Sequence, residues 1–198
     1  MRPWGILGGS FDPIHNGHIL LAQEVRDRLQ LEKVIFIPAY VAPHKIGQSF
    51  ASAADRFAMT ALAVEGINDF SVSDMELRRG SVSYTVDTML ELRKMYPRQE
   101  FYFIIGADSV PQLKTWNRIE ELFSLVKFAA VYRPGYEDVL DRAREDFGRQ
   151  AERIVMVHTT EYDVSSTAIR QKVQAGQSIS DMVPAAVAEY IEKNGLYR

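Results

Sequence analysis

Phe101-Tyr102-Phe103-Ile104-Ile105-Gly106 is the stretch of sequence that decides the fold. Large apolar and aromatic residues follow one another in it without polar alternation, and a glycine ends the run. Such a run is typical of a strand that is buried on both faces, as the strands of parallel sheets are. We therefore predict a central parallel strand over residues 101–105 that ends at Gly106.

Other short apolar runs lie on both sides of this strand in the sequence, and longer amphipathic segments separate them. The predicted strands cover residues 4–7, 34–37, 68–72, 101–105, 128–132 and 153–157. The predicted helices cover residues 18–30, 53–64, 85–95, 118–125, 136–147, 167–175 and 184–194. Strands that alternate with helices imply parallel strands joined by right-handed crossovers. We predict an α/β fold, a doubly wound parallel sheet with a small C-terminal helical portion.

The composition limits the classes of protein to which the chain can belong. Its 198 residues predict a single domain over residues 1–198, and its net charge of -3 argues against nucleic acid as a partner. The absence of cysteine excludes disulfides, thiolate nucleophiles and zinc–thiolate sites, and it is typical of a reducing compartment. No apolar run approaches the ~20 residues that span a bilayer. We expect a cytoplasmic protein without a membrane partner, either a monomer or a homo-oligomer.

An unusual segment, GGSFDPIHNGH from Gly8 to His18, follows the first predicted strand. Paired glycines let backbone N–H groups approach a ligand closely, and Asn16 is a good N-cap for the helix that follows. The N-terminus of a helix attracts phosphate through its free N–H groups and partial positive charge. His15 and His18 flank that terminus, and either can donate to phosphate oxygens and can be charged at neutral pH. The segment therefore predicts a phosphate site.

Four other interpretations of this first segment have less support. The motifs G-x-x-x-x-G-K-[ST] and G-x-G-x-x-G are both absent, which disfavours a P-loop NTPase and a Rossmann oxidoreductase. A glycine turn with two surface histidines would account for each residue separately, but it leaves their combination unexplained. A metal ion shared by His15 and His18 has no support from a nearby cysteine or third histidine, so we predict no metal ligands.

A second segment, Asp163 to Arg170, opens a late predicted helix. Ser165 or Ser166 can cap this helix, and the hydroxyls and free N–H groups then form another anion site. Side chains on a helix lean toward its N-terminus, so Arg170 leans back over the first turn, where its planar fork suits phosphate oxygens. An ordinary cap beside a surface arginine is the alternative. We expect the two segments, although far apart in the chain, to converge on one polyphosphate.

The element His15-Asn16-Gly17-His18 resembles the H-x-G-H signature of the nucleotidyltransferase superfamily, and Ser165–Arg170 resembles its second signature, S-S-T-x-I-R. The longer string from Gly8 to His18 is similar to the nicotinate-nucleotide adenylyltransferase branch, and the resemblance runs nearly end to end. It implies a Rossmann-like nucleotidyltransferase fold that transfers AMP from ATP to nicotinate mononucleotide in NAD biosynthesis. Magnesium is then expected as cofactor, held mainly by the phosphates of ATP. Ser10 and Ala42 stand where threonine and proline are more usual.

The resemblance also implies roles for single residues. The implied catalytic residues are His15, His18, Lys45 and Arg170. The implied ATP-binding residues are Gly8, Gly9, Ser10, Phe11, His15, His18, Gly106, Asp108, Ser165, Ser166, Thr167 and Arg170. The implied nicotinate mononucleotide-binding residues are Lys45, Tyr84, Thr85, Asp108 and Trp116.

Each acceptor residue also has an ordinary structural interpretation. Lys45 can be an exposed loop lysine, the segment Ser83–Thr85 a simple helix cap, and Trp116 a core residue. The nearest rival function is another transferase of the superfamily, which acts on nicotinamide mononucleotide, phosphopantetheine or a choline-type phosphate. A non-catalytic nucleotide-binding module on the same fold is the rival from another class.

Overall fold

The computed structural model describes residues 1–43, 50–132, 138–160 and 162–198. Its strands are β1 (Trp4–Gly9), β2 (Lys33–Pro38), β3 (Phe70–Val72), β4 (Phe101–Gly106), β5 (Lys127–Tyr132) and β6 (Ile154–His158). They form one sheet in the order β3-β2-β1-β4-β5-β6. The pairings whose register is described, β1 with β4, β4 with β5 and β5 with β6, are all parallel. The chain starts in the middle of this order, fills one edge and then fills the other, which confirms the predicted doubly wound α/β fold.

Helices connect the strands and follow the last of them. The α-helices are α1 (Asn16–Arg28), α2 (Ala53–Val64), α3 (Met75–Arg79), α4 (Thr85–Met95), α5 (Ile119–Leu125), α6 (Val139–Phe147), α7 (Ser166–Gln174) and α8 (Ala185–Lys193). Two 3₁₀ helices, η2 (Ala107–Thr115) and η3 (Gly148–Arg153), precede α5 and β6. The predicted C-terminal helical portion is confirmed as α7 and α8. Within the described ranges, no helix combines the length and the apolar character that crossing a bilayer requires.

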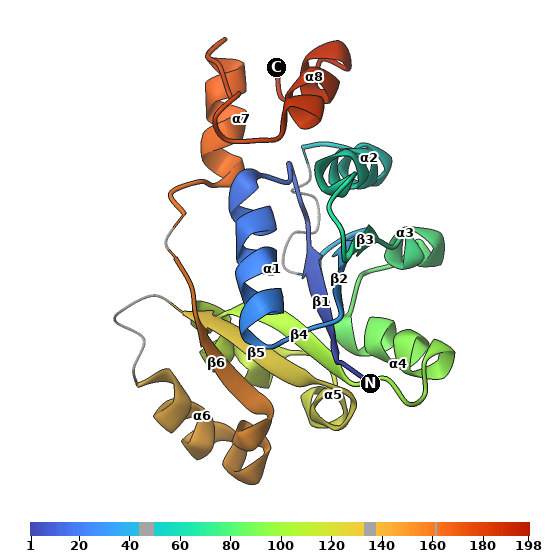
Figure 1. Cartoon of the computed structure of the whole chain (residues 1–198), viewed down its shortest axis with the longest axis vertical. Coiled ribbons are helices and arrows are strands. Elements are labelled where there is room, and N and C mark those ends of the chain that lie inside the picture. Colours follow the sequence, from blue (N-terminus) through green and yellow to red (C-terminus); the bar gives the residue numbers. More distant parts are fainter. Residues whose placement is uncertain (44–49, 133–137, 161) are drawn as a thin grey trace. The chain divides into compact units, whose positions relative to one another are not determined.

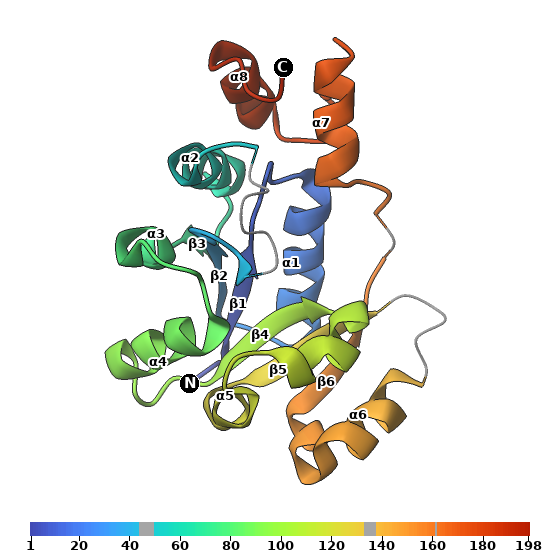
Figure 2. The same cartoon turned by 180° about the vertical axis from the view of Figure 1, so that it is seen from behind.

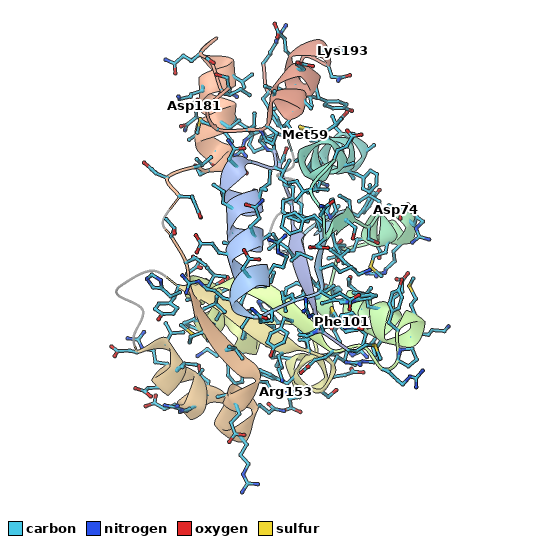
Figure 3. The ribbon with its side chains drawn as sticks, in the orientation of Figure 1. Met59, Asp74, Phe101, Arg153, Asp181 and Lys193 are labelled. Carbon is cyan, nitrogen blue, oxygen red and sulfur yellow. The ribbon has the colours of Figure 1, made fainter. Side chains whose placement is uncertain are left out.

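The chain divides into two compact units. The first unit consists of Met1–Leu7, Glu24–Val34 and Tyr84–Glu161, and its core lies along β4 and β5. Phe103, Ile104 and Ile105 are consecutive in β4 and all buried, so both faces of the strand are covered, as the sequence predicts for a parallel strand. Figure 2 shows β4, β5 and β6 side by side, and Figure 3 labels Phe101 at the start of β4.

The second unit consists of Gly8–Gln23, Ile35–Ser83 and Tyr162–Arg198. In it α2 packs against α8, and Met59 of α2 and Val187 of α8 are buried without exposed surface (Figure 1; Met59 is labelled in Figure 3). Near the end of α8 the hydroxyl of Tyr190 donates to Asp55 Oδ1 at 3.0 Å. The C-terminal helices are therefore fixed onto α2 by both apolar and polar contacts.

Several predicted boundaries are wrong, for physical reasons that differ. The first helix begins at Asn16 rather than at residue 18 and ends at Arg28 rather than at residue 30. Helix α3 was not predicted, because its five residues are too few to show a helical period. Helix η2 was missed because Pro111 interrupts the pattern and a 3₁₀ helix has a different period.

Candidate active site

The first predicted phosphate segment forms the corner between β1 and α1, and residues 8–18 of this corner lie in the second unit. Asn16 is the first residue of α1 and not the N-cap before it, so that prediction is wrong. Its side-chain amide donates to the backbone oxygen of Asp181 at 3.1 Å, and its N–H donates to that of Met182 at 2.9 Å. Asp181 lies in the connection between α7 and α8 (Figure 3). The C-terminal helical portion therefore holds the start of α1 in place.

The two histidines of this corner contact each other directly. Their rings stack with centroids 3.7 Å apart and planes inclined by 27°. The backbone N–H of His15 donates to His18 Nδ1 at 3.3 Å, so Nδ1 is an acceptor in this arrangement. A neutral His18 then carries its proton on Nε2 and can donate it to a phosphate oxygen. His18 is half-buried, and its ring also packs edge-on against Phe11.

Burial determines the charge of His15, which is only 8% exposed. Desolvation lowers the pKa of His15 to about 4, because burial penalises the charged imidazolium. His15 is therefore neutral at neutral pH, and the expectation that either histidine can be charged is wrong for this one. A Cβ atom added to Gly17 would lie 3.1 Å from His15 Nδ1, so the glycine leaves room for the ring.

The lowered pKa of His15 predicts a loss of stability in acid. The unfolded chain takes up a proton near the ordinary value of 6.5, whereas the folded chain does so only near 4. The contribution is therefore present above pH 6.5 and is lost as the pH falls toward 4, by about 3 kcal/mol in all. Urea unfolding across this pH range should show a steeper decline for the wild type than for His15→Gln. Equal pH slopes for the two proteins would contradict the assignment.

The second predicted segment forms the start of α7, also in the second unit. The Ser165 hydroxyl accepts from the N–H of Ala168 at 3.2 Å, which confirms it as the N-cap. Arg170 leans back over the first turn, as predicted, and its Nη2 donates to the hydroxyl of Thr167 at 3.2 Å. The guanidinium of Arg170 thus lies at the N-terminal end of α7.

The two corners meet through hydrogen bonds to backbone carbonyls. The hydroxyl of Ser166 donates to the oxygen of Pro13 at 2.8 Å, and Arg170 Nη1 donates to that of Asp12 at 2.7 Å. These contacts join residues more than 150 positions apart, since their sequence separations are 153 and 158. The predicted convergence of the corners is therefore confirmed, and the serine and arginine of the second signature face the loop of the first.

Asp12 is a buried acid that the sequence interpretation missed. Its side chain is only 6% exposed, and both carboxylate oxygens accept hydrogen bonds. Oδ1 accepts from the hydroxyl of Tyr197 at 2.7 Å and from the N–H of Ala51 at 3.2 Å, and Oδ2 accepts from the N–H of Phe50 at 2.9 Å. The available signal was an acidic residue between Phe11 and Pro13, but nothing in the sequence names its partners.

Arg56 on α2 was missed as well, although it is a charged residue on an apolar helix face. It is 2% exposed, and its Nη1 and Nη2 donate to the backbone oxygens of Ser10 and Tyr40 at 2.7 and 2.9 Å. Burial lowers the pKa of Arg56, and the nearby Asp12 opposes that shift. Arg56 thereby ties the loop after β1 to the loop after β2.

The structure places the glycines and the phenylalanine of the predicted ATP site at the end of β1 and just after it. Gly8 and Gly9 are the last residues of β1, and a Cβ on Gly9 would lie 3.1 Å from the ring of Phe11. Phe11 is itself buried, with a φ of 47°. Lys45 lies outside the described residues.

Apart from Lys45, the predicted acceptor residues lie in the first unit. Tyr84 is the N-cap of α4 and Thr85 its first residue, and the tyrosine side chain is exposed. Gly106 ends β4, and a Cβ atom there would collide with the carboxylate of Asp108. The glycine is what allows the exposed Asp108 side chain to fold back over the end of the strand.

Trp116 follows η2 and is half-buried. Its ring packs edge-on against Phe103 and Phe128, with centroids 6.0 and 6.1 Å away. Arg118, two residues on, pairs with Asp87 in the first turn of α4 at 3.2 Å. The tryptophan therefore has core contacts, as its ordinary interpretation predicts, while its segment is tied to the helix that Thr85 begins.

The fold and the two converging corners define a nucleotidyltransferase of the H-x-G-H class. The family model described as cytidylyltransferase-like matches residues 6–172. The chain belongs to this cytidylyltransferase-like family, and within it to the nicotinate-nucleotide adenylyltransferases.

Similar proteins match nearly the whole chain. A probable nicotinate-nucleotide adenylyltransferase of Desulfitobacterium hafniense strain Y51 is 41% identical over 98% of this chain and 95% of its own length. One of Bacillus anthracis strain CDC 684 is 43% identical, over 100% and 99%. The structure of Plasmodium falciparum nicotinic acid mononucleotide adenylyltransferase complexed with NaAD has a TM-score of 0.79 at 19% identity, covering 100% and 98% of the two chains. This last likeness supports the fold.

Proposed function

We propose that the chain transfers AMP from ATP to nicotinate mononucleotide, which yields nicotinate adenine dinucleotide and pyrophosphate in NAD biosynthesis. The observation that carries this proposal is the direct contact of the two signature corners, in which Ser166 and Arg170 donate to the loop that precedes His15. The names of the similar proteins support nicotinate mononucleotide as the acceptor.

The reaction needs no nucleophile from the protein. A phosphate oxygen of the mononucleotide attacks the α-phosphorus of ATP in line, and the bond from that phosphorus to the bridging oxygen of the β-phosphate breaks. The pyrophosphate leaves with the electron pair of that bond. Catalysis then consists of positioning and charge stabilisation, and positioning alone can supply ~7–11 kcal/mol.

The second unit supplies the groups that would bind the triphosphate. His18 Nε2 donates to an oxygen of the leaving pyrophosphate, His15 acts as a neutral group, and Arg170 spreads its charge over two oxygens. The ATP-binding role of the backbone at Gly8–Phe11 and of the α7 N-terminus follows from their N–H groups. Lys45 completes the catalytic set as a point charge, a role that rests on the resemblance alone.

The first unit supplies the groups assigned to the acceptor and to the rest of ATP. Thr85 begins α4, and the partial positive charge of a helix N-terminus favours the nicotinate carboxylate. Trp116 offers a half-exposed indole for the pyridine ring, and Asp108 accepts from sugar hydroxyls beside Gly106. We also propose that residues 1–198 work as one nucleotidyltransferase domain, because the family match includes parts of both units.

Enzymes of this kind generally use a divalent metal, and we propose magnesium. Among the described residues no group of three histidine or acidic side chains could hold one. The carboxylate of this corner, Asp12, already accepts three hydrogen bonds, so it suits a structural role. The metal would therefore be bound by phosphate oxygens and water, and would supply charge neutralisation there. The predicted cytoplasmic location remains a prediction.

An acceptor assay tests the proposed function. With ATP and magnesium, the protein should form the dinucleotide and pyrophosphate from nicotinate mononucleotide with a kcat/KM roughly 10–100-fold above that for nicotinamide mononucleotide. This ratio corresponds to one lost charge-assisted hydrogen bond of about 1.5–3 kcal/mol. Chromatography of the dinucleotide together with a pyrophosphate assay measures both products. Pyrophosphate release without a dinucleotide would refute the proposed acceptor. The absence of both products would refute the transferase activity.

A further inference from the structure

Tyr197 is buried in the second unit although it lies near the C-terminus of the chain. It is 7% exposed, and its backbone adopts the left-handed region with a φ of 64°. The hydroxyl donates to Asp12 Oδ1 at 2.7 Å. Burial raises the pKa of Tyr197 well above its ordinary value, and Asp12 raises it further, so the hydroxyl keeps its proton at every working pH.

Asp12 carries two kinds of contact at once. Its carboxylate receives Tyr197 and the N–H groups of Phe50 and Ala51, while its backbone carbonyl receives Arg170. The residue whose carbonyl holds Arg170 is therefore itself held in place through its carboxylate.

Phe50 gives Arg170 a second support that also depends on Asp12. The guanidinium carbon of Arg170 lies 4.1 Å from the centroid of the Phe50 ring, a cation–π contact. The N–H of Phe50 donates to Asp12 Oδ2, so the same carboxylate fixes the backbone under this ring. Phe50, Arg170 and Asp12 thus form a closed set of three mutual contacts.

We propose that Tyr197 is a positioning residue for adenylyl transfer, which acts through Asp12 to set the place of Arg170 and of the Ser10–Pro13 loop. The inference rests on the proposed function, since it assigns Arg170 to the triphosphate. Tyr197 itself touches no substrate. Its hydroxyl donates to Asp12 Oδ1 beside the N–H of Ala51, while the N–H of Phe50 donates to Oδ2, and this side-chain donor helps to orient the carboxylate.

A merely stabilising role is the alternative, and Tyr190 offers a matched comparison for it. Its hydroxyl also donates to a carboxylate oxygen, Oδ1 of the half-buried Asp55, at 3.0 Å. Asp55 in turn accepts from Ser52 at the N-cap of α2, and none of these contacts reaches Asp12 or Arg170. Tyr190→Phe therefore removes the same kind of hydrogen bond from the same C-terminal segment and keeps the contacts of Asp12 and Arg170.

The experiment compares Tyr197→Phe with Tyr190→Phe at a temperature where both are folded by circular dichroism. We expect kcat/KM for ATP to fall about tenfold in Tyr197→Phe and to stay within about twofold in Tyr190→Phe. In an Arg170→Lys background, Tyr197→Phe should lower kcat/KM by less than about twofold, because the placement of the guanidinium is already lost. Wild-type activity in Tyr197→Phe, or a full tenfold effect in the lysine background, would overturn the inference.

A second variant keeps the test open if Tyr197→Phe does not fold. Phe50 is 61% exposed, so Phe50→Leu should fold normally and remove only the aromatic support of Arg170. A severalfold loss of kcat/KM for ATP supports the inference that the contacts among Phe50, Arg170 and Asp12 position the arginine, and an unchanged value overturns it. The affinity for a non-hydrolysable ATP analogue, measured calorimetrically on the same proteins, separates the two proposals. If the wild type binds the analogue but makes no dinucleotide, the proposed function is refuted. Weaker binding of the analogue by Tyr197→Phe, with unchanged binding by Tyr190→Phe, would still support the inference.

Discussion

Replacing His18 by alanine should leave a folded protein whose turnover is about 10²–10³-fold lower, as for other enzymes that lose one preorganised donor to a developing charge. The side chain is half-buried and stacks on His15, so its removal opens space at the surface rather than in the core. What the variant loses is the proton on Nε2, the nitrogen that carries it because Nδ1 accepts from the His15 N–H. Initial rates under saturating substrates and a thermal unfolding curve measure both effects.

Two conservative variants identify the nitrogen that matters. In His18→Gln the amide nitrogen reaches the position of Nε2, whereas in His18→Asn it reaches only that of Nδ1. We expect glutamine to recover about tenfold of the lost turnover and asparagine to recover little, since Nδ1 is an acceptor in the folded protein. Near-normal turnover in His18→Ala would refute the catalytic assignment, and better recovery by asparagine would refute the donor assigned to the ring.

Local pattern was enough to predict the architecture. The uninterrupted apolar run of β4 indicates burial on both faces, and the alternation with amphipathic segments indicates parallel pairing. Pattern fails where an element is too short or is not α-helical. Helix α3 spans less than two turns, and η2 includes Pro111, so neither shows the period on which the prediction depends.

The candidate site divides in the same way. The histidines and the start of α7 were found because each is a short motif with a local physical meaning. Asp12, Arg56 and Tyr197 were missed because their partners lie far away in sequence, and the separation of Asp12 from Tyr197 is 185 residues. Asn16 was misplaced for the same reason, since its side-chain nitrogen donates to Asp181 in the connection between α7 and α8, which is distant in sequence.

Arg170→Ala should lower kcat/KM for ATP by about 10²–10³-fold, because one side chain both ties the corners together and is assigned to the triphosphate. The variant loses the bonds to the Asp12 carbonyl and the Thr167 hydroxyl as well as the charge. Lysine restores the charge but not the planar fork, so Arg170→Lys should regain less than about tenfold. Steady-state kinetics with ATP varied, beside urea unfolding, separate the two losses.

The unfolding data decide between a structural tie and a substrate contact. If Arg170 only joined the corners, its loss would lower the free energy of unfolding while kcat/KM of the folded fraction stayed near the wild-type value. Lys172→Ala provides the matched control, since it removes a positive charge from the same helix. The hydrogen bond described at Lys172 outside the helix is accepted by its backbone oxygen, so the substitution keeps it. If Arg170 contacts the substrate, kcat/KM for ATP should fall strongly in Arg170→Ala and change within about twofold in Lys172→Ala. Added salt should not restore kcat/KM in either variant. Because the arginine is held by a carbonyl, a hydroxyl and an aromatic face before any substrate arrives, its reorganisation on binding is small, and the preorganised charge is what the kinetic loss would measure.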